Sequence, residues 1–482
     1  MYTLMHISDL HRSAASPISN DELISCLLTD NQRFSLETPP ISSPNALIIS
    51  GDLVAGLPIK AGDYPSALER QFDEAHELIK RLADVFFEGD HTRIIITPGN
   101  HDIDWNSAFT AMTPVAHDHK DIEKLLYELN SPYRWSWENL QLFQINDYSL
   151  YEKRFGYFQS LIDKFYKGNK VTFAIDPKRE WNLFNLDSGK IIVCAFNSCV
   201  NADCFSSIGD ISGQAISQSH LACPDALLKI AVWHHDIQGS PHRSDYMDTG
   251  VVRLLIDRGY RLGLYGHRHS AGASPYSLHV TPEDSQMAII SAGSLCAAPH
   301  QLPPGLLRQY NIIQIFDDYV HARIHVREMN SGVFSQGRLI EQGGKSYMDL
   351  KWTAVPQNSL VNTGRSAFNL SSIEEIEGLL KRESYEEVVT IIDSYGSKLG
   401  RYGRQLLIKA LYGTKNWIRL EQELPDPQNS DELSYVISAA IALKHWDKAE
   451  TVVCSAKKSG QFSQMFLDEL KNRIAAMKGI RG

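Results

Sequence analysis

The stretch YTLMHISDLH at residues 2–11 joins a run of mostly apolar side chains to a carboxylate and an imidazole. The run at residues 2–7 has the length and composition of a buried β-strand, so we expect Asp9 and His11 in the loop at its carboxyl end. Similar runs, each followed by a polar cluster, recur as far as about residue 330. They cover residues 46–50, 93–97, 191–197, 228–233, 262–265 and 287–291.

Helical patterns separate these runs. Between residues 67 and 87, apolar side chains recur at spacings of three and four, which places them on one face of a helix. Strands that alternate with amphipathic helices predict a layered α/β architecture. We therefore expect residues 1–330 to form one α/β domain.

The chain has 482 residues, which is long enough for more than one domain. Residues 103–180 interrupt the alternation and are rich in aromatic side chains, so we predict a mostly helical insertion there. Residues 331–370 are rich in Gly, Ser and Asn and weakly periodic, which indicates a linker or wrapping arm. Residues 371–482 show a purely helical pattern and are predicted to form a separate all-α domain.

Three helical segments of this C-terminal domain begin with an aromatic residue, namely Tyr385, Trp417 and Trp446, spaced 32 and 29 residues apart. This period is near that of tetratricopeptide repeats, and the segments faintly resemble tetratricopeptide-like helical hairpins. An irregular helical bundle is the alternative interpretation. We expect this domain to offer a surface for a protein partner or for self-association.

The composition is that of a globular chain, with 43% hydrophobic and 22% charged residues and a net charge of -10. The negative charge gives no global attraction to nucleic acid or to an anionic membrane, although a local basic patch stays compatible with a nucleic-acid substrate. No segment resembles a signal peptide or an apolar membrane span, and the seven cysteines show no CxxC spacing. We therefore expect a soluble cytoplasmic protein with reduced thiols and no membrane partner.

Residues that can bind metal ions follow five of the predicted strands. Because loops at strand ends of a layered α/β fold converge on one crevice, five segments can deliver ligands to a single place. Carboxylate, carboxamide and imidazole groups without thiolates suit Mn²⁺, and also Fe or Zn²⁺, in a catalytic site. A single Asp or His in such a core is more often structural, but five clusters in register favour a metal centre. The predicted ligands are Asp9, His11, Asp52, Asn100, His234, His267 and His269.

Asp52 is the expected bridge between two divalent ions, which would lie roughly 3.5 to 4 Å apart and clamp one phosphate. The ordered motifs DxH, GD, GNHD, HH and GHxH resemble those of the calcineurin-like metallophosphoesterase superfamily. The resemblance covers residues 1 to about 330 and implies a central β-sandwich flanked by helices. It also implies two metal sites that share Asp52, one completed by Asp9, His11 and His269 and the other by Asn100, His234 and His267.

The activity implied by the resemblance is hydrolysis of phosphodiesters or phosphomonoesters by a metal-activated hydroxide, as in phosphodiesterases, nucleases and phosphatases. The resemblance also places His101 outside the metal shell and over the substrate, where it stabilises the phosphate or protonates the leaving group. Asp102 is then implied to orient His101.

The motifs leave the substrate open. Protein phosphatases of this superfamily have an arginine shortly after the GD motif and GNHE as the third motif, whereas here no arginine closely follows Asp52 and the third motif ends in Asp102. A protein phosphatase is therefore disfavoured. GNHD and GHxH occur both in nucleases and in cyclic-nucleotide phosphodiesterases, so we expect a nucleotide or nucleic-acid substrate. The alternative function is a catalytically inactive scaffold that recognises proteins through its C-terminal helices.

Four smaller signals have two interpretations each. His235 could replace His234 as a ligand, although in the HH motif of the family the first histidine usually binds metal. Arg268 and His300 could lie near the phosphate or serve as surface residues. The aromatic residues of the insertion could stack on nucleobases, but such residues more often form a core.

Overall fold

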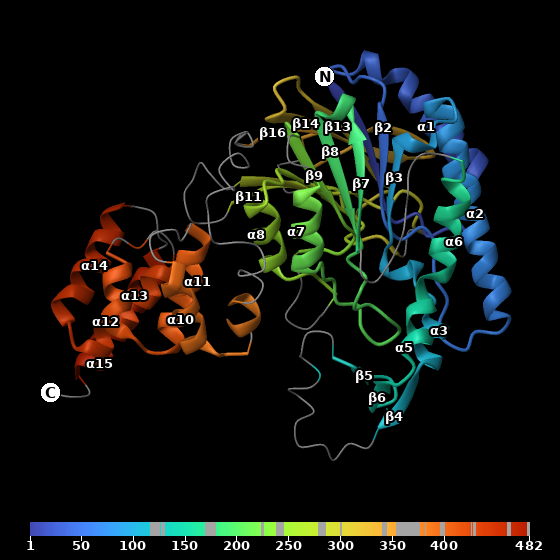
Figure 1. Ribbon diagram of the computed structural model, residues 1–482. Helices are drawn as coiled ribbons and strands as arrows, with labels where there is room; N and C mark the ends of the chain where they lie inside the picture. Colours follow the sequence, from blue (N-terminus) through green and yellow to red (C-terminus); the bar gives the residue numbers. More distant parts are fainter. Residues whose placement is uncertain are drawn as a thin grey trace. The chain divides into compact units, whose positions relative to one another are not determined.

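The computed structural model describes residues 1–115, 126, 131–168, 180–222, 226–237, 245–277, 286–298, 301–339, 345–352, 376–380, 382–395, 401–425, 427, 430–459 and 464–479. The chain divides into two compact units (Figure 1). The first comprises residues 1–277 and 286–357, and the second comprises residues 278–285 and 358–482.

One sheet of the first unit begins with three parallel strands, β1 (Tyr2–Ile7), β2 (Ala46–Ser50) and β3 (Ile94–Thr97). Four antiparallel strands extend it beyond β1, in the order β15-β14-β13-β1-β2-β3 with β16 also paired to β14. These are β13 (Gln309–Ile315), β14 (His321–Asn330), β15 (Val333–Gln336) and β16 (Tyr347–Lys351).

A second sheet has the order β11-β12-β10-β9-β8-β7. Its four inner strands are parallel, and its two edge strands pair antiparallel. The strands are β7 (Trp181–Leu186), β8 (Ile191–Phe196), β9 (Leu228–Val232), β10 (Leu262–Tyr265), β11 (Gly272–Ser277) and β12 (Gln286–Ser291).

The two sheets share one hydrophobic core. Leu47 of β2, Ile230 of β9 and Leu264 of β10 are fully buried in it. The helices α1 (Asn20–Arg33), α2 (Tyr64–Phe87) and α6 (Gly156–Phe165) pack their apolar faces into the same core. Figure 1 shows α7 (Gly213–Leu221) and α8 (Thr249–Asp257) on the other flank, beside the second sheet. The predicted β-sandwich flanked by helices is confirmed.

The described part of the insertion is partly helix and partly sheet, so the prediction of a mostly helical insertion missed the sheet. It contains the helices α3 (Trp105–Thr110), α5 (Tyr148–Glu152) and α6 and an antiparallel sheet of β4 (Met112–Val115), β6 (Gln141–Ile145) and β5 (Tyr133–Ser136). In β5 the buried residues are Arg134 and Ser136, while Tyr133 and Trp135 are only half-buried. A strand is usually predicted from apolar residues that alternate with polar ones. Because β5 buries polar side chains, its sequence does not show this alternation.

The described part of the predicted linker is sheet, since β15 and β16 both lie between residues 331 and 352. Ser331 and Gly332 have φ angles of 51° and 79°. Two consecutive positive φ angles between paired strands are those of a tight type I′ hairpin turn. The small residues that suggested a linker therefore include a turn, and residues 340–344 and 353–370 of the predicted linker lie outside the described residues.

In the residues that the structure describes, the second unit is all α, as expected. Its helices α10, α12 and α14 begin at Tyr385, Trp417 and Trp446, the three aromatic residues of the predicted repeat. The bounds are α10 (Tyr385–Tyr395), α11 (Arg401–Gly413), α12 (Trp417–Glu423), α13 (Ser430–Leu443), α14 (Trp446–Ser459) and α15 (Gln464–Gly479). Two hydrophobic clusters of its own hold these helices together.

Within the described residues of the whole chain, no helix is long and apolar enough to cross a membrane.

A buried ion pair ties α1 to β14. Arg327 donates to both carboxylate oxygens of Asp30 at 2.9 and 2.6 Å, and the Tyr310 hydroxyl donates to Asp30 at 2.5 Å. Asp30→Asn is expected to lower the free energy of unfolding by about 2 kcal/mol or more, because it removes one of the two carboxylates that pair with the buried guanidinium of Arg327 and leaves only Glu37, at 2.7 Å. Urea unfolding monitored by circular dichroism measures this change.

The matched control is Asp21→Asn. Asp21 also lies on α1 and pairs with Arg81 at 2.7 Å, but its side chain is 87% exposed. Exposed ion pairs contribute little, so the control should shift the midpoint far less. Equal shifts for the two variants would contradict a stabilising role for the buried pair.

Candidate metal centre

The carboxyl ends of five strands bring the predicted ligands together. Parallel pairing of β1, β2 and β3 places the loops that follow them at one edge of the first sheet. Parallel pairing of β9 and β10 does the same in the second sheet. The loops after these five strands carry Asp9, His11, Asp52, Asn100, His234, His267 and His269.

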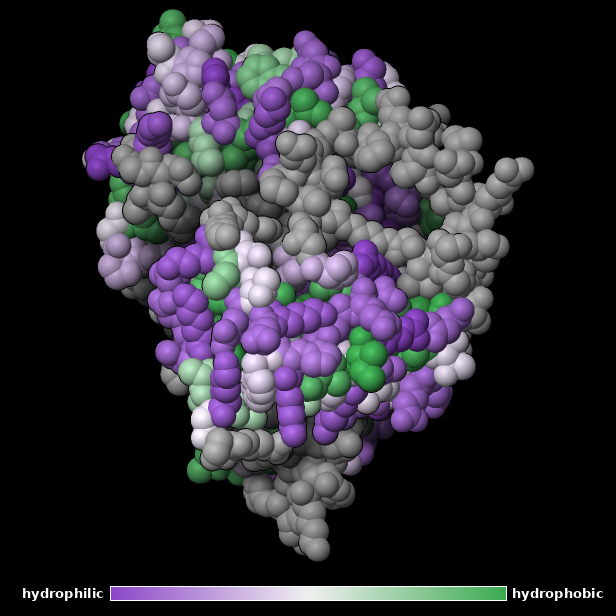
Figure 2. All heavy atoms as spheres, turned by 90° about the vertical axis from the view of Figure 1, so that its left-hand side faces the viewer, coloured by the Kyte–Doolittle hydropathy of each residue, from purple (hydrophilic) through white to green (hydrophobic). Residues whose placement is uncertain are grey.

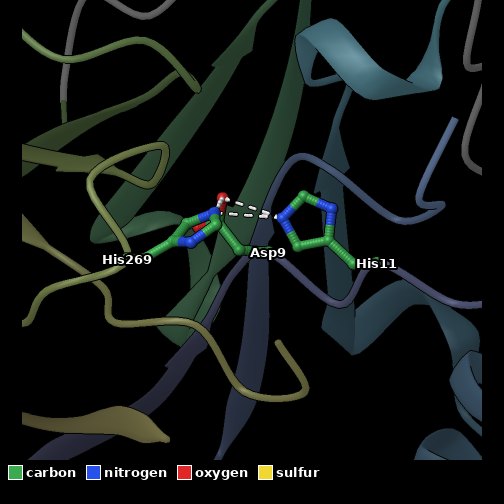
Figure 3. Close-up of side chains that lie close together, drawn as sticks. All are labelled: Asp9, His11 and His269. Atoms are coloured by element: carbon green, nitrogen blue, oxygen red, sulfur yellow. Dashed lines mark hydrogen bonds and ion pairs between the residues drawn. The ribbon is translucent and has the colours of Figure 1, made fainter. Parts of the chain in front are cut away.

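Asp9, His11 and His269 form one group of converging donor atoms (Figure 3). Asp9 Oδ1 lies 3.2 Å from Nε2 of His269 and 3.8 Å from Nε2 of His11. The two imidazole nitrogens are 3.0 Å apart. Within the described residues, the buried Asp9 Oδ1 makes no hydrogen bond of normal geometry. A buried carboxylate oxygen aimed at two imidazole nitrogens fits a metal ligand.

Asp52, Asn100, His234 and His267 form a second group. Nε2 of His234 lies 3.3 Å from Asp52 Oδ2 and 3.1 Å from Asn100 Oδ1. Nδ1 of His267 lies 3.1 Å from the same Asn100 oxygen. Asp52 Oδ2 is also 3.9 Å from Nε2 of His11 in the first group, so Asp52 links the two groups.

Five of these residues have backbones in the left-handed region. The φ angles are 52° at Asp9, 42° at His11, 53° at Asp52, 68° at His267 and 54° at His269. Asp and His tolerate this region better than most residues, yet each such conformation is unfavourable by about 1–3 kcal/mol. Strain that recurs at five donor positions is typical of a functional site.

Glycines allow the loops to approach one another closely. A Cβ atom on Gly99 would lie 2.1 Å from Asp52 Oδ1, and one on Gly266 would lie 1.9 Å from the Ser8 hydroxyl and 2.9 Å from Asp9 Oδ2. Any side chain at either position would therefore displace a predicted ligand.

Backbone carbonyl groups orient two of the imidazoles. Nδ1 of His234 lies 2.8 Å from the carbonyl oxygen of Ser50, and Nδ1 of His269 lies 2.8 Å from that of Gln301. A proton on each Nδ1 satisfies these contacts and leaves Nε2 with its lone pair directed at the centre. The loop geometry thus selects the tautomer that binds metal.

Charges within the centre are strongly coupled. Burial raises the pKa of Asp9, but His269 outweighs burial and holds that pKa at about 2. Burial lowers the pKa of His269, and Asp9 outweighs it and raises that pKa to about 9. His234 likewise holds the pKa of Asp52 well below its usual range, while Asp52 raises the pKa of His234 to about 9 against burial. A raised pKa favours the protonated imidazole, so protons compete with a metal ion for these nitrogens.

A family model described as calcineurin-like phosphoesterase matches residues 2–271. The chain belongs to this family. The donor set of the centre agrees with the divalent metal ions that such a phosphoesterase binds, because it combines oxygen and nitrogen ligands within bonding reach of common points. No curated protein matches the chain.

Several solved structures are similar to this family member over about three quarters of its length. PhoD is 8% identical, covers 73% of this chain and 72% of its own, and has a TM-score of 0.41. The calcineurin-like phosphoesterase YfkN of Bacillus subtilis is 10% identical over 74% and 91%, with a TM-score of 0.30. A mutant of Vps29 from Entamoeba histolytica is 9% identical over 73% and 99%, with a TM-score of 0.26. The matched family segment ends before the C-terminal helices, and no comparison supports the tetratricopeptide resemblance.

His101 lies beside the donor groups of the phosphoesterase centre. Its ring centroid is 4.9 Å from that of His11, and its Nδ1 is 2.7 Å from the carbonyl oxygen of Ala55. One of its nitrogens also lies within 4.8 Å of donor atoms of His11 and Asp52. The geometry therefore admits two roles for His101, a substrate-facing group and a metal ligand.

Asp102 does not orient His101 by direct contact, which corrects the expected arrangement. Its carboxylate accepts hydrogen bonds from the backbone amides of Leu53, Val54 and Gly99 at 2.7, 3.1 and 2.8 Å. Burial and the neighbouring Asp52 raise the pKa of Asp102 to about 8. Asp102 thus fixes the loop that carries Ala55, and the Ala55 carbonyl orients the ring of His101.

The structure gives His235 and Arg268 contacts outside the two donor groups. His235 directs Nδ1 at the Ser198 hydroxyl, 2.9 Å away, whereas His234 faces Asp52. Arg268 pairs with Asp236 at 3.3 Å, and His300 lies outside the described residues.

The sequence analysis did not predict Asp245, whose Oδ2 is 3.8 Å from Nε2 of His267. Among the described residues, the strand that precedes Asp245 is β9, which ends at Val232, so Asp245 does not belong to a strand-end cluster.

The aromatic residues of the insertion serve mainly as core. Phe143 stacks on Phe205 at 4.8 Å between centroids, and Phe109 packs against both. Trp137 and Tyr148 differ, because they are 81% and 53% exposed. These two remain available for contact with a substrate or partner.

Proposed function

We propose that the chain is a binuclear metal-dependent hydrolase of phosphate esters that acts on nucleotides or nucleic acid. The observation that carries this proposal is the convergence of oxygen and nitrogen donors from five loops on both sides of Asp52. Structural metal sites close around one ion with a single compact ligand set. Two groups joined by one carboxylate instead fit a pair of catalytic ions.

In this proposal, Asp9, His11 and His269 hold one ion, Asn100, His234 and His267 hold the other, and Asp52 binds both. Mn²⁺ is the expected metal, because a mixed oxygen and imidazole set suits it, with Fe or Zn²⁺ as alternatives. When bound, the ions supply Lewis acidity that lowers the pKa of a coordinated water and neutralises charge on the phosphate.

His101 is proposed as the group that assists the leaving oxygen. The hydrogen bond from Nδ1 to the Ala55 carbonyl fixes the ring and leaves Nε2 as the nitrogen that meets the substrate. Its backbone amide donates to Asp52 Oδ1 at 2.9 Å, so the ring is held beside the proposed bridging residue. From this position a protonated Nε2 can donate to the leaving alkoxide or stabilise a phosphate oxygen.

The test is a substrate panel with Mn²⁺. It should contain bis(p-nitrophenyl) phosphate, a phosphomonoester, cyclic nucleotides, RNA, and single- and double-stranded DNA. Metal-dependent turnover that disappears in Asp52→Asn would support the proposal and exclude a contaminating enzyme. If the purified protein bound no metal and hydrolysed no ester, the proposal would be wrong and the scaffold alternative would replace it.

We propose that the second unit contributes a partner or self-association surface and not part of the centre. Its two hydrophobic clusters comprise residues 376–474 only, whereas the core of the first unit ends at Trp352. The face of this unit seen in Figure 2 is mainly hydrophilic. Independent cores predict that the units fold separately.

A chain ending at Asn369 is therefore expected to stay folded, keep its metal ions and retain most of its turnover of bis(p-nitrophenyl) phosphate. Metal analysis, circular dichroism and steady-state kinetics of the truncated and full chains test this expectation. A truncated protein that is folded and metal-loaded but inactive on this small ester would show that the helical unit contributes to catalysis.

A further inference from the structure

A cavity of about 220 Å³ lies between the insertion and the loop that follows β8. Tyr148, Glu152 and Arg154 line it from the insertion, and Asn197 and Asn201 line it from the loop. This volume is below the usual range for ligand pockets, about 300–1,000 Å³, so the cavity can enclose only part of a small organic molecule.

Both walls of the cavity are continuous with the metal centre. Asn197 directly precedes Ser198, whose hydroxyl accepts a hydrogen bond from the His234 amide at 3.1 Å. On the other wall, the Arg154 carbonyl accepts from the amide of Asp104 at 2.8 Å. Asp104 lies two residues after Asp102. Each wall of the cavity is thus joined by one hydrogen bond to a loop that carries predicted ligands.

The walls are fixed before any ligand binds. Arg154 is only 4% exposed, and its guanidinium donates to the carbonyls of Tyr151 and Val200 at 3.0 and 2.6 Å. Arg134 donates to Asp203 at 2.6 Å, and the Tyr151 hydroxyl donates to the same carboxylate at 2.8 Å. A preformed wall reduces the entropy lost on binding.

The charges of the lining decide the class of group that fits. The charged lining residues are Arg134 and Arg154 together with Glu152 and Glu180, and Arg134 is already paired with Asp203 at 2.6 Å. Burial and the nearby Asp210 raise the pKa of Glu180, as expected where negative charge accumulates. The lining therefore disfavours a second anionic group. Carboxylates instead accept hydrogen bonds from hydroxyl groups.

The polar and aromatic lining residues differ in exposure. Asn197 is buried, and its Oδ1 accepts from the Cys199 amide at 2.8 Å, which leaves its NH₂ group as a donor. Glu180 lies beside it, since the Asn197 amide donates to the Glu180 carbonyl at 2.9 Å. Tyr148, 53% exposed, stands at the outer rim with an accessible ring.

We propose that this cavity binds the ribonucleoside part of a nucleotide substrate. The ribose hydroxyls meet Glu180 and Asn197 at the end near the metal centre, and the base stacks on Tyr148 at the rim. This inference rests on the proposed phosphoesterase function and names the organic group that the enzyme selects.

Nucleoside binding tests the cavity without requiring turnover. Adenosine, guanosine, cytidine and uridine, each with its 2′-deoxy counterpart, are titrated into the full metal-free chain by calorimetry. At least one ribonucleoside should bind, and Glu180→Gln should weaken it roughly 10- to 100-fold, as expected for loss of a charged hydrogen-bond acceptor. Glu138→Gln, an exposed change in the turn after β5, is the matched control and should bind as the unaltered chain does.

Kinetics with Mn²⁺ separate this inference from the proposed function. Tyr148→Ala should raise KM for the nucleotide roughly tenfold, the loss expected for one stacking contact, and raise KM for dimethyl phosphate, which has no ring to stack, far less. Hydrolysis of the small ester without any nucleoside binding would overturn the cavity assignment alone. Nucleoside binding without hydrolysis of any ester would overturn the proposed function alone. Equal losses on both substrates would show that Tyr148 is structural and contradict its stacking role.

Discussion

Asp52→Asn is expected to lose both metal ions and roughly 10³-fold or more in turnover. Asp52 Oδ2 lies 3.3 Å from Nε2 of His234 and 3.9 Å from Nε2 of His11, so a single oxygen faces both donor groups. Replacing it with a neutral amide removes the negative charge that both ions would share. Metal-ion catalysis contributes several kcal/mol, and each 1.36 kcal/mol corresponds to about a tenfold change in rate.

Asp9→Asn is the matched comparison, because Asp9 is equally buried and its Oδ1 approaches the imidazoles of His11 and His269, while one of its oxygens also lies within 4.8 Å of a nitrogen of His234. This variant should keep more metal than Asp52→Asn. Asp73→Asn, an exposed change on α2, should keep the full content. Elemental analysis of proteins purified in Mn²⁺ gives the ions per chain. An Asp52→Asn protein that retains as much metal as the unaltered chain would remove Asp52 from the bridging role.

The strand ends of this fold could be predicted because two features of the sequence coincide there, the end of an apolar run and the start of a tight polar loop. A buried parallel strand needs a nearly continuous apolar run, and the loop after it must leave the core at once. Ala46–Ser50 followed by Gly51 and Asp52 shows both features, and β2 begins and ends at the predicted residues. Parallel pairing then fixes which ends meet, so local patterns sufficed to place donors from distant segments together.

The insertion could not be predicted in the same way, because its structure depends on contacts far apart in the chain. Arg134 can be buried in β5 because Asp203, 69 residues away in the sequence, pairs with its positive charge. In the sequence, Arg134 indicates an exposed position, which removes the alternation that marks a strand. Tyr148 gives no sign of its position at the rim of a cavity for the same reason.

The environment of Asp102 shows a further limit. Its place directly after His101 suggests a partner for that imidazole, yet its carboxylate turns toward three backbone amides instead. Every residue except proline has a backbone amide, so the sequence does not show which amides will donate to a given carboxylate. The folded structure is needed to identify these hydrogen bonds. The functional consequence is indirect, because Asp102 positions the carbonyl that positions His101.

His101→Ala is expected to keep its metal ions and lose about 10² to 10⁴ in turnover, the range for removing one general acid or oxyanion donor. The contact between Nδ1 and the Ala55 carbonyl directs Nε2 away from the loop, where it can meet a leaving oxygen. The loss should be largest for esters with poor leaving groups, which need a proton most. A nitrophenyl ester, whose leaving group departs as a stable anion, should suffer less.

Kinetics on an alkyl and a nitrophenyl ester, together with metal content, separate the possible roles of His101. A larger loss on the alkyl ester at full metal content identifies proton donation. Equal losses at full metal content point to stabilisation of charge on the phosphate. Loss of metal would instead make His101 a ligand, as its donor atom within 4.8 Å of those of His11 and Asp52 allows. His91→Ala is the control, because that imidazole bonds the Phe165 carbonyl and takes no part in the centre, so neither rate nor metal should change.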